Sequence, residues 1–278
     1  MVINNIRKKD SFMKNTIGFF GGGNMGRAIM GGLIKTGLYQ PSDILVYDVH
    51  QPTLDKLSSE LGLQTSNDMT YVAENSQIII LSVKPNVLPS VLKAIAHKIS
   101  IDTLVVSIAA GITLQQLKEL LSPQHKLIRV MPNTPALVAE GMSGICCNEN
   151  LSAEEKETVL SIFSSFGKAE LIPEKFMDAV VGVSGSSPAY VYMFIEALAD
   201  GAVLEGLPRD QAYTFAAQAV YGSAKMVLET KKHPGELKDM VCSPGGTTIE
   251  AVKALEEQGF RAAVMNAVRV AAEKNKSM

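Results

Sequence analysis

Apolar and polar residues alternate in blocks over the first two thirds of the chain. Short apolar runs predict buried strands, and the longer segments between them, where apolar residues recur every three or four positions, predict amphipathic helices. We expect strands at residues 17–20, 43–48, 77–83, 104–108 and 126–130, with weaker candidates at 144–147 and 169–172. We expect helices at residues 27–34, 54–61, 87–99, 114–121 and 153–166. This alternation indicates a parallel, doubly wound sheet.

The pattern changes near Pro173. From residue 175 to residue 274 the strand pattern is almost absent, and we expect helices at residues 189–206, 210–229, 236–241 and 247–274. The helix at 189–206 is apolar on nearly every side, which predicts that it is buried on every side. Such a helix needs partners on several faces, so we expect these helices to form the interface of a homodimer. A large helical core within one chain is the alternative.

The composition sets further bounds. A length of 278 residues suggests two domains, and 46% hydrophobic residues suffice for a large core. The net charge of −2 gives no sign of a nucleic-acid surface, and acidic residues interrupt the longest apolar stretch, which argues against a membrane span. The three cysteines, which include the adjacent Cys146 and Cys147, form neither a disulfide framework nor a metal site. We therefore expect a cytoplasmic protein without a metal.

The first 13 residues are polar and basic. They lack the apolar core of a signal peptide, so we expect a disordered lead-in, or a start of the protein at Met13.

A glycine-rich turn follows the first expected strand. Gly21, Gly23 and Gly26 form the pattern Gly-x-Gly-x-x-Gly between that strand and the next helix. The first glycine permits a tight turn, the second lets a pyrophosphate approach the backbone, and the third lets the helix pack against the strand. Unpaired N–H groups and the helix dipole then stabilise the phosphate charge. The sequence thus predicts an α/β protein with a Rossmann-type dinucleotide-binding domain at residues 14–174, followed by an all-α dimerisation domain at residues 175–278.

Further cofactor contacts are expected at the carboxyl ends of the strands, where open parallel sheets bind ligands. Asp48 ends the second strand, roughly 20 residues after the last glycine, where a carboxylate that binds the ribose is expected. Other strand ends carry small, polar or proline-bearing turns at residues 82–85, 109–111 and 132–134. Lys84 could bind a phosphate or the ribose, or it could simply be solvated.

The sequence offers no convincing candidates for a catalytic acid or base. His50, His97, His125 and His233 lack a spaced carboxylate or nucleophile, and we expect His97 and His125 at surface ends of helices. Hydride transfer to an activated acceptor, such as an imine, needs little of this machinery. Residues 243–248, Ser-Pro-Gly-Gly-Thr-Thr, open a helix and could bind a substrate carboxylate through backbone N–H groups and two hydroxyls. A plain helix cap by threonine is the alternative, and both can hold together.

Several stretches together resemble the pyrroline-5-carboxylate reductase family, which catalyses the last step of proline biosynthesis. The resemblance extends from about residue 15 to residue 272, and its most specific part is the 243–248 turn followed by Gly-Phe-Arg at 259–261. The other matching stretches are residues 18–26, 83–85, 109–111, 133–135, 182–190, 198–201, 206–209 and 233–235.

The resemblance implies NAD(P)H-dependent reduction of 1-pyrroline-5-carboxylate to L-proline, by active sites built between two subunits of a homodimer or a larger assembly of dimers. It implies that Thr248 lies beside the substrate nitrogen as the hydroxyl that shares its proton, with Gly245, Gly246 and Thr247 at the carboxylate. The residues expected to line the cofactor, with Asp48 included from its position, are Phe20, Gly21, Gly22, Gly23, Asn24, Met25, Gly26, Asp48, Asn67, Ser82, Val83, Lys84, Pro85, Ile108, Ala109 and Ala110.

The chain departs from the family pattern near the cofactor and near the substrate. Many relatives have a small or basic-flanked stretch where this chain has Asp-Val-His at residues 48–50. A carboxylate there would repel a 2′-phosphate and accept hydrogen bonds from a free 2′-hydroxyl, so we expect NADH to be used at least as well as NADPH. Lys231 and Met240 stand where some relatives have a glutamate and an asparagine near the substrate, so neither role is assigned to them.

Two other functions fit the same two-domain plan. A 3-hydroxyacid dehydrogenase would need a catalytic lysine on the helix between the domains, and residues 190–204 contain none. A non-catalytic NAD(P)-sensing regulator would need the cofactor fold but not Thr248. The intact Ser-Pro-Gly-Gly-Thr-Thr turn argues against a regulator.

Overall fold

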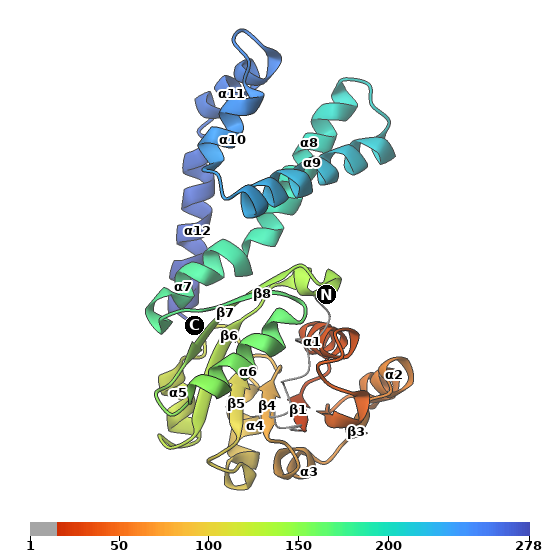
Figure 1. Ribbon diagram of the computed structural model, residues 1–278, viewed down its shortest axis with the longest axis vertical. Coiled ribbons are helices and arrows are strands. Elements are labelled where there is room, and N and C mark those ends of the chain that lie inside the picture. Colours follow the sequence, from red (N-terminus) through yellow and green to blue (C-terminus); the bar gives the residue numbers. More distant parts are fainter. Residues whose placement is uncertain (1–15) are drawn as a thin grey trace, which may run out of the picture. The chain divides into compact units, whose positions relative to one another are not determined.

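The computed structural model describes residues 16–278 (Figure 1), so the expected lead-in at residues 1–13 lies outside the described residues. The chain divides into two compact units. Unit 1 extends to Gly185 and also includes Ala271–Met278, whereas unit 2 is Ser186–Val270. Unit 2 is therefore inserted between two parts of unit 1.

The described part of unit 1 contains an eight-stranded sheet with the order β3-β2-β1-β4-β5-β6-β7-β8 (Figure 1). Neighbouring strands are parallel, except for β6 and β7. The central strands are short and buried on both faces, as their unbroken apolar runs predict. The strands are β1 Ile17–Phe20, β2 Ile44–Tyr47, β3 Gln64–Ser66, β4 Ile78–Leu81, β5 Leu104–Ser107, β6 Lys126–Met131, β7 Gly141–Cys147 and β8 Gly167–Leu171.

Helices cover both faces of this sheet and close two apolar cores. Because successive strand residues point to opposite faces, Phe19 of β1 packs in one core and Phe20 in the other. Helices α1, α2 and α6 contribute side chains to the first core, and α3, α4 and α5 contribute to the second. These helices are α1 Asn24–Lys35, α2 Gln51–Leu61, α3 Met69–Glu74, α4 Leu88–Ile95, α5 Leu114–Leu120 and α6 Ala153–Ser164. The prediction of a doubly wound α/β domain is confirmed.

Three details of unit 1 differ from the sequence prediction. Strand β7 runs antiparallel to β6, because only the short 3₁₀ helix η3 (Thr134–Val138) lies between them and a parallel pair needs a long crossover. The pattern misses β3 and α3, since β3 is a three-residue polar strand without an apolar run. The helix expected at 87–99 is shorter, and α4 continues into the 3₁₀ turn η2 (Ala96–Lys98).

Short helical turns end the main part of unit 1. After β8 come the 3₁₀ turn η4 (Glu174–Phe176), helix α7 (Met177–Val180) and the π-helical turn η5 (Val181–Gly185). The chain returns to unit 1 in the last turns of α12 (Phe260–Lys276), where Asn275 Nδ2 donates to Asp178 Oδ1 over 2.6 Å.

Unit 2 is helical, as expected for the chain beyond Pro173 (Figure 1). Its helices are α8 Ser187–Leu204, α9 Arg209–Thr230, α10 Pro234–Val241, α11 Thr247–Glu257 and the first part of α12. The prediction of one helix over 247–274 is wrong, because Gly259 adopts a left-handed conformation (φ +70°) between α11 and α12. Within one chain, α8 and α9 pack on each other through the small residues Ala199, Ala212 and Ala216.

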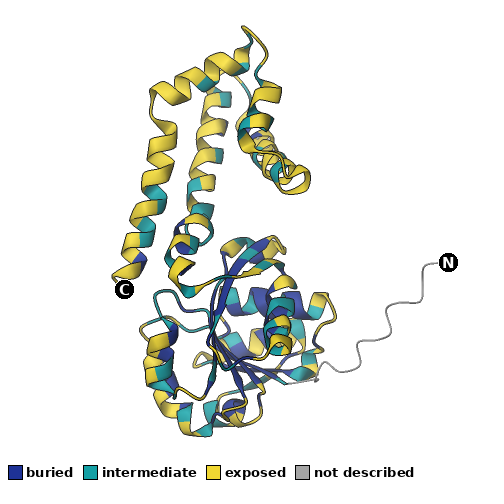
Figure 2. Cartoon of the chain, turned by 60° about the vertical axis from the view of Figure 1, so that its left-hand side comes forward, coloured by how far each residue is buried: buried dark blue, intermediate teal, exposed yellow. Residues whose placement is uncertain are grey.

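Most residues on the helices of unit 2 are exposed in a single chain (Figure 2), and they include many large apolar residues. The prediction that residues 189–206 are buried on every side is wrong for the isolated chain: Met193 is 69% exposed, and Ala199 is the buried residue of α8. Large apolar residues on every other helix of unit 2 are exposed as well, among them Tyr213, Phe215, Tyr221, Met226, Leu228, Met240, Val241, Ile249, Leu255, Val264 and Met265. Within residues 16–278, no helix combines the length and apolar character that a bilayer span requires.

Candidate active site

The glycine-rich turn sits between β1 and α1, and two of its glycines are required by the backbone. Gly21 has φ +105°, and a Cβ at this position would lie 2.7 Å from the carbonyl oxygen of Ser82. A Cβ at Gly26 would lie 2.7 Å from the carbonyl oxygen of Gly21. Gly23 differs, because a Cβ there would meet no atom within 4 Å. The turn is thus closed toward the protein at Gly21 and Gly26 and open outward at Gly23, where a ligand can approach the backbone.

The start of α1 offers the donors that such a ligand needs. Gly23 is the N-cap residue, has extended backbone geometry and supplies no side-chain cap. The first turn, which begins with Asn24 and Met25, contains no acidic residue. Its N–H groups are therefore free to bind a diphosphate, aided by the helix dipole. The residues present fit a dinucleotide.

Ser82, which follows β4, holds the glycine-rich turn in place by hydrogen bonds. Its backbone N–H donates to the carbonyl of Phe20 over 2.9 Å. Its hydroxyl donates to the carbonyl of Gly21 over 2.6 Å. Since Gly21 N–H also donates to the carbonyl of Tyr47 in β2 over 2.8 Å, the turn is held from both adjacent strands.

Asp48 is held in place by two backbone donors. Gly22 N–H donates to Oδ2 over 2.7 Å, and His50 N–H donates to Oδ1 over 2.9 Å. The carboxylate is partly exposed, and each oxygen keeps a lone pair for a ligand. It therefore faces the edge of the sheet in one orientation, beside the glycine turn.

A cavity of about 330 Å³ opens beside Asp48. Its walls are mainly apolar, which suits a flat ring system, and they come from the ends of β1, β2 and β4 together with α3 and α4. The lining residues are Gly21, Tyr47, Asp48, Val49, Met69, Val83, Val87, Ser90 and Val91. Sequence reasoning had named Gly21, Asp48 and Val83 of these. It missed Met69 because α3 had not been recognised, and it missed the α4 residues because their apolar period indicates only a core-facing helix.

The other expected cofactor residues lie along the same edge of the sheet. Asn67 is exposed in the turn after β3. Lys84 is exposed beside Val83 and Pro85, has no carboxylate partner among the described residues, and accepts Val87 N–H at its carbonyl over 2.9 Å. After β5, Ile108 and Ala110 are partly exposed, whereas Ala109 is buried.

The second expected site, at residues 243–248, lies at the start of α11 in unit 2. Gly245 has φ +66°, and Gly246 N–H donates to the carbonyl of Ser243 over 3.0 Å, which closes the turn. Gly246 is the N-cap residue and no side chain caps the helix, so the alternative of a threonine cap is wrong. Thr247 and Thr248 are the first two helical residues, and neither hydroxyl has a hydrogen-bond partner in the described part of the chain. Free N–H groups and two free hydroxyls at one helix start can hold a carboxylate.

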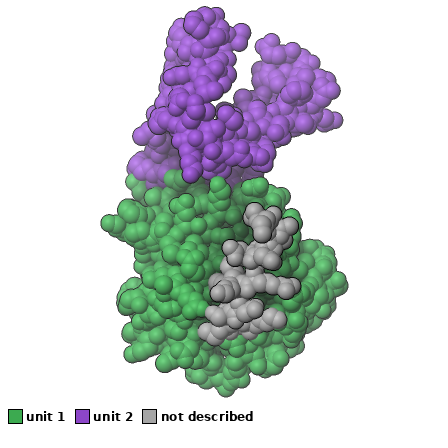
Figure 3. All heavy atoms as spheres, in the orientation of Figure 1, with its two compact units in different colours: residues 1–185, 271–278 green, residues 186–270 purple. Residues whose placement is uncertain are grey.

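The glycine turn of unit 1 and the 243–248 turn of unit 2 belong to different units of the chain (Figure 3). Taken separately, the first turn fits a dinucleotide, and the second fits a small anionic group. Among the described residues, no cluster of His, Cys, Asp and Glu could hold a metal ion. Burial raises the pKa of the Cys146 thiol to about 12 and that of Cys147 to about 11, so neither is a nucleophile at neutral pH.

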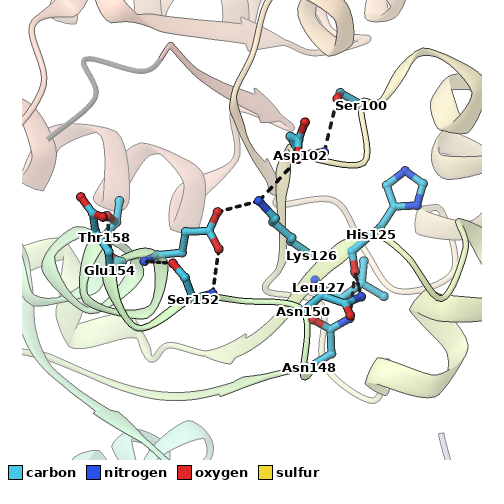
Figure 4. Close-up of polar contacts among 11 residues, drawn as sticks. Ser100, Asp102, His125, Lys126, Leu127, Asn148, Asn150, Ser152, Glu154 and Thr158 are labelled. Carbon is cyan, nitrogen blue, oxygen red and sulfur yellow. Dashed lines mark hydrogen bonds and ion pairs between the residues drawn. The ribbon is translucent and has the colours of Figure 1, made fainter. Parts of the chain in front are cut away.

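Three of the four histidines make structural contacts, whereas His97 is exposed in η2, as expected. His125 is buried rather than at the surface, so that prediction is wrong: its Nδ1 lies 2.7 Å from Ser122 Oγ, and its carbonyl accepts Asn148 Nδ2 over 2.8 Å. Figure 4 shows this carbonyl between Asn148 and Asn150, beside the ion pair of Lys126 with Asp102. His50 bonds Thr53 through its ring, and His233 caps α10 by accepting Gly235 N–H.

The fold and these two turns define a two-domain oxidoreductase that uses a nicotinamide dinucleotide. The pyrroline-5-carboxylate reductase dimerisation family matches residues 174–278, and the NADP oxidoreductase coenzyme F420-dependent family matches residues 16–111. The pyrroline-5-carboxylate reductase of Escherichia coli is 54% identical over 266 residues, which cover 96% of this chain and 99% of the relative. The chain belongs to the pyrroline-5-carboxylate reductase family.

Solved structures agree. The structure of a pyrroline-5-carboxylate reductase from Coxiella burnetii matches with a TM-score of 0.89 at 33% identity, over 95% of this chain and 98% of that chain. The Plasmodium falciparum pyrroline carboxylate reductase, solved with NADP bound, matches with a TM-score of 0.86 at 35% identity, over 95% and 97% of the two chains. Membership of this family does not favour a hydroxyacid dehydrogenase or a non-catalytic sensor.

Proposed function

We propose that this protein catalyses the NAD(P)H-dependent reduction of 1-pyrroline-5-carboxylate to L-proline. The observation that supports this most strongly is the combination of 54% identity to a pyrroline-5-carboxylate reductase over nearly the whole chain with an intact Ser-Pro-Gly-Gly-Thr-Thr turn. That turn carries the free hydroxyls and N–H groups that a cyclic imino acid needs.

In this proposal the two turns bind different reactants, the coenzyme and the substrate. A bound nicotinamide coenzyme supplies the hydride. The Gly21–Gly26 turn and the start of α1 hold the diphosphate, and the strand ends at Ser82–Pro85 and Ile108–Ala110 flank the coenzyme. The N–H groups of Gly245 and Thr247 hold the substrate carboxylate, while the Gly246 N–H keeps the turn closed by its bond to the Ser243 carbonyl. The chain contributes binding and orientation, because a protonated imine is already an electrophile.

Thr248 orients the imine nitrogen and shares its proton. Its hydroxyl is half-buried at the start of α11, is free of other hydrogen bonds among the described residues, and can both donate and accept. A hydroxyl can therefore hold the protonated imine before reduction and the amine afterwards, without a change in its own charge.

The test of this proposal is the initial rate of coenzyme oxidation with pyrroline-5-carboxylate, for the natural protein and Thr248→Ala. We expect turnover in the natural protein and a fall in kcat of at least ~10²-fold in the variant. Thr214→Ala, on an exposed part of α9, is the matched control and should keep the natural rate. Coenzyme binding without turnover in the natural protein would refute the proposal.

We assign the choice between NADH and NADPH to Asp48. Since Gly22 and His50 N–H groups hold this carboxylate at the edge of the coenzyme cavity, it cannot turn away from a 2′-phosphate without breaking both hydrogen bonds. A free 2′-hydroxyl, in contrast, can donate to it. We expect NADH to be used at least as well as NADPH, although the relative from Plasmodium falciparum was solved with NADP.

The variant Asp48→Asn tests this assignment. It removes the charge and keeps a hydrogen-bond acceptor, so kcat/KM with NADPH should rise relative to NADH by ~10-fold, which corresponds to about 1.4 kcal/mol. Asp43→Asn, at the other end of β2, is the control for the loss of a partly exposed carboxylate. A strong preference of the natural protein for NADPH, unchanged in Asp48→Asn, would remove Asp48 from this role.

The assembly that we propose is a homodimer, or a larger oligomer of dimers, formed through unit 2. The family match to a dimerisation domain and the exposed apolar side chains of α8 and α9 support it. We further propose a cytoplasmic location, which the three free cysteines support because reduced thiols persist there.

A further inference from the structure

A polar cavity of about 360 Å³ lies in unit 1, and none of the residues that line it belongs to the glycine turn or to the 243–248 turn. Its wall is formed by the chain after β5, by β6, by η4 and α7, and by the end of α12 that belongs to unit 1. A cavity of this size suits a small organic molecule. The polar side chains of the wall that bear on its ligand are Arg129, Glu174, Lys175, Asp178, Asn275 and Lys276.

The guanidinium of Arg129 is the most deeply buried charge of this cavity, since Arg129 is 5% exposed. Its Nη1 donates to Glu174 Oε1 over 3.1 Å, and the same oxygen accepts Leu114 N–H over 2.8 Å. The guanidinium has no other hydrogen-bond partner in the described part of the chain, so most of its N–H donors are free. Because Arg129 lines the cavity, these donors can bind a carboxylate that enters it.

Two exposed lysines add positive charge to the wall. Neither Lys175 nor Lys276 forms an ion pair with a carboxylate among residues 16–278. The ammonium of Lys175 lies 5.0 Å from the centre of the Phe176 ring, a contact that leaves its N–H donors available. A second carboxylate on the ligand can therefore pair with these lysines while the first binds the guanidinium.

Asp178 and Asn275 add free acceptors to the same wall. Asn275 Nδ2 donates to Asp178 Oδ1 over 2.6 Å, which fixes the orientation of the amide because an ionised carboxylate only accepts. Asn275 is 5% exposed, and its Oδ1 is buried without a hydrogen-bond partner among the described residues. Asp178 Oδ2 has no partner there either. An ammonium group beside this pair would supply the donors that both oxygens lack.

We propose that this cavity binds an acidic α-amino acid, which carries two carboxylates and one ammonium group. The charged side chains of the wall are three cations and two carboxylates, so such a ligand matches them with the opposite signs. One carboxylate binds Arg129, the other pairs with the two lysines, and the ammonium group lies beside Asp178 and Asn275. An inorganic anion would leave the free acceptors without a donor, and a neutral amino acid would leave the lysines without a partner.

Isothermal titration calorimetry of the full-length natural protein with L-glutamate and with L-aspartate tests the proposal. We expect saturable binding of at least one of the two. L-alanine lacks the second carboxylate and glutarate lacks the ammonium group, so each should bind at least ~10-fold more weakly, because each loses charge-assisted contacts. The proposal is overturned if neither acidic amino acid binds saturably, or if L-alanine, glutarate or sulfate binds as tightly as they do.

Two variants show whether the amino acid binds in this cavity. Asp178→Asn keeps the shape of the side chain and removes the charge that holds the ammonium group, whereas the double variant Lys175→Met, Lys276→Met removes the exposed cations. We expect each variant to bind the amino acid at least ~10-fold more weakly than the natural protein. The double variant Lys168→Met, Lys274→Met is the matched control, because these exposed lysines lie outside the cavity, and its affinity should be natural. Natural affinity in either of the first two variants would place the ligand elsewhere.

A further variant separates this cavity from the proposed substrate turn. Thr248→Ala should keep the natural affinity for the amino acid, because Thr248 does not line the cavity. A loss of affinity in Thr248→Ala would assign the binding to the substrate turn and overturn the proposal. If Asp178→Asn failed to fold, the double variant of the exposed Lys175 and Lys276 would still decide. Calorimetry needs no turnover, so the proposed reduction can fail while this binding site stands, and the reverse.

Discussion

Unit 1 and unit 2 differ in how far their apolar side chains are buried. In unit 1, Phe19, Phe20 and Phe163 are fully buried, and two apolar cores lie on the two faces of the sheet. In unit 2, the buried apolar residues are three alanines, while Met193 and Phe215 are more than 60% exposed. Within a single chain, unit 1 thus has large apolar cores, whereas unit 2 has only a small core around three alanines.

This difference supports the proposal that unit 2 carries the interface with another chain. Monomeric proteins rarely expose such a large number of neighbouring apolar side chains. The match of residues 174–278 to a dimerisation family agrees with a homo-oligomer. Four experiments test the contrast between the two units and the features of unit 1 described above.

The largest effect is expected from a charge placed on the exposed apolar surface of unit 2. Phe215→Asp should abolish the oligomer at micromolar concentration, because burying an unpaired carboxylate in an interface costs several kcal/mol. Sedimentation velocity would measure the loss. Ile101→Asp is the matched control, since Ile101 is 58% exposed in unit 1 and should leave the assembly unchanged. An intact oligomer in Phe215→Asp would place the interface elsewhere.

A truncation in the core of unit 1 should destabilise that unit alone. Phe163→Ala removes a fully buried ring that lies 5.7 Å from the ring of Phe166. The free energy of unfolding should fall by about 3 to 5 kcal/mol, as is usual for such truncations. Denaturant unfolding followed by circular dichroism would measure it. The shift should not depend on protein concentration, whereas the transition of unit 2 should, because its stability is linked to association. If the unfolding transitions of both units depended on protein concentration in the same way, the two units would not differ in their dependence on a second chain.

A methyl group in the glycine turn should act on ligand binding more than on folding. Gly21→Ala forces a φ of +105° on a residue with a side chain and places its Cβ against the Ser82 carbonyl, at a cost of about 1 to 3 kcal/mol. We expect coenzyme binding, measured by fluorescence titration, to be lost or reduced at least ~10-fold. Gly31→Ala is the control, because a Cβ at that position of α1 would meet no atom within 4 Å. Natural affinity in Gly21→Ala would argue against the turn as the diphosphate site.

The smallest effect is expected from the ion pair at the opposite edge of the sheet. Burial raises the pKa of Glu155, but hydrogen bonds from Lys126 and Ser152 and the charge of Lys126 outweigh it, so the pKa lies below its ordinary value. A lowered pKa in the folded state stabilises the fold above the unfolded value of about 4.3, and this contribution is lost as the pH falls through the folded value.

Lys126→Met should therefore cost up to about 1 kcal/mol at neutral pH, and less in acid below the ordinary glutamate range. Urea unfolding at several pH values would measure it, with the exposed Lys93→Met as the control. A cost that stayed constant into acid would show that the lysine acts by packing rather than by its charge.

The features that could be predicted from the sequence are those with a strong local cause. Unbroken apolar runs identify the central strands, and the glycine pattern identifies the turn at Gly21, because only glycine tolerates that backbone and that contact with Ser82. The sequence does not indicate the break at Gly259, because a helical period continues across it, although its left-handed conformation divides α11 from α12. The features that escaped prediction have causes that the apolar pattern does not reveal: the ring of His125 lies against the carbonyl of Ile99, 26 residues away, and β7 is antiparallel because of the short connection that precedes it.

Of the candidate site, the positions along the sheet edge could be predicted, and the contacts that hold them could not. Asp48 was expected from its spacing, yet its bonds to Gly22 and His50 depend on the path of the turn. Asn133 stands in a motif that the sequence singles out, but its partners Met142 and Ser184 are 9 and 51 residues away. Spacing along the chain does not indicate such a bridge.

The insertion of unit 2 between two parts of unit 1 bears on the order in which the chain folds during its synthesis. All eight strands have been made once the ribosome passes Leu171, but Asn275, which binds Asp178, arrives only after the whole of Ser186–Val270 has followed. At usual rates of translation that interval is on the order of ten seconds. The nascent sheet therefore waits for the contact between Asp178 and Asn275, while helices with exposed apolar residues emerge and become able to meet those of a neighbouring nascent chain.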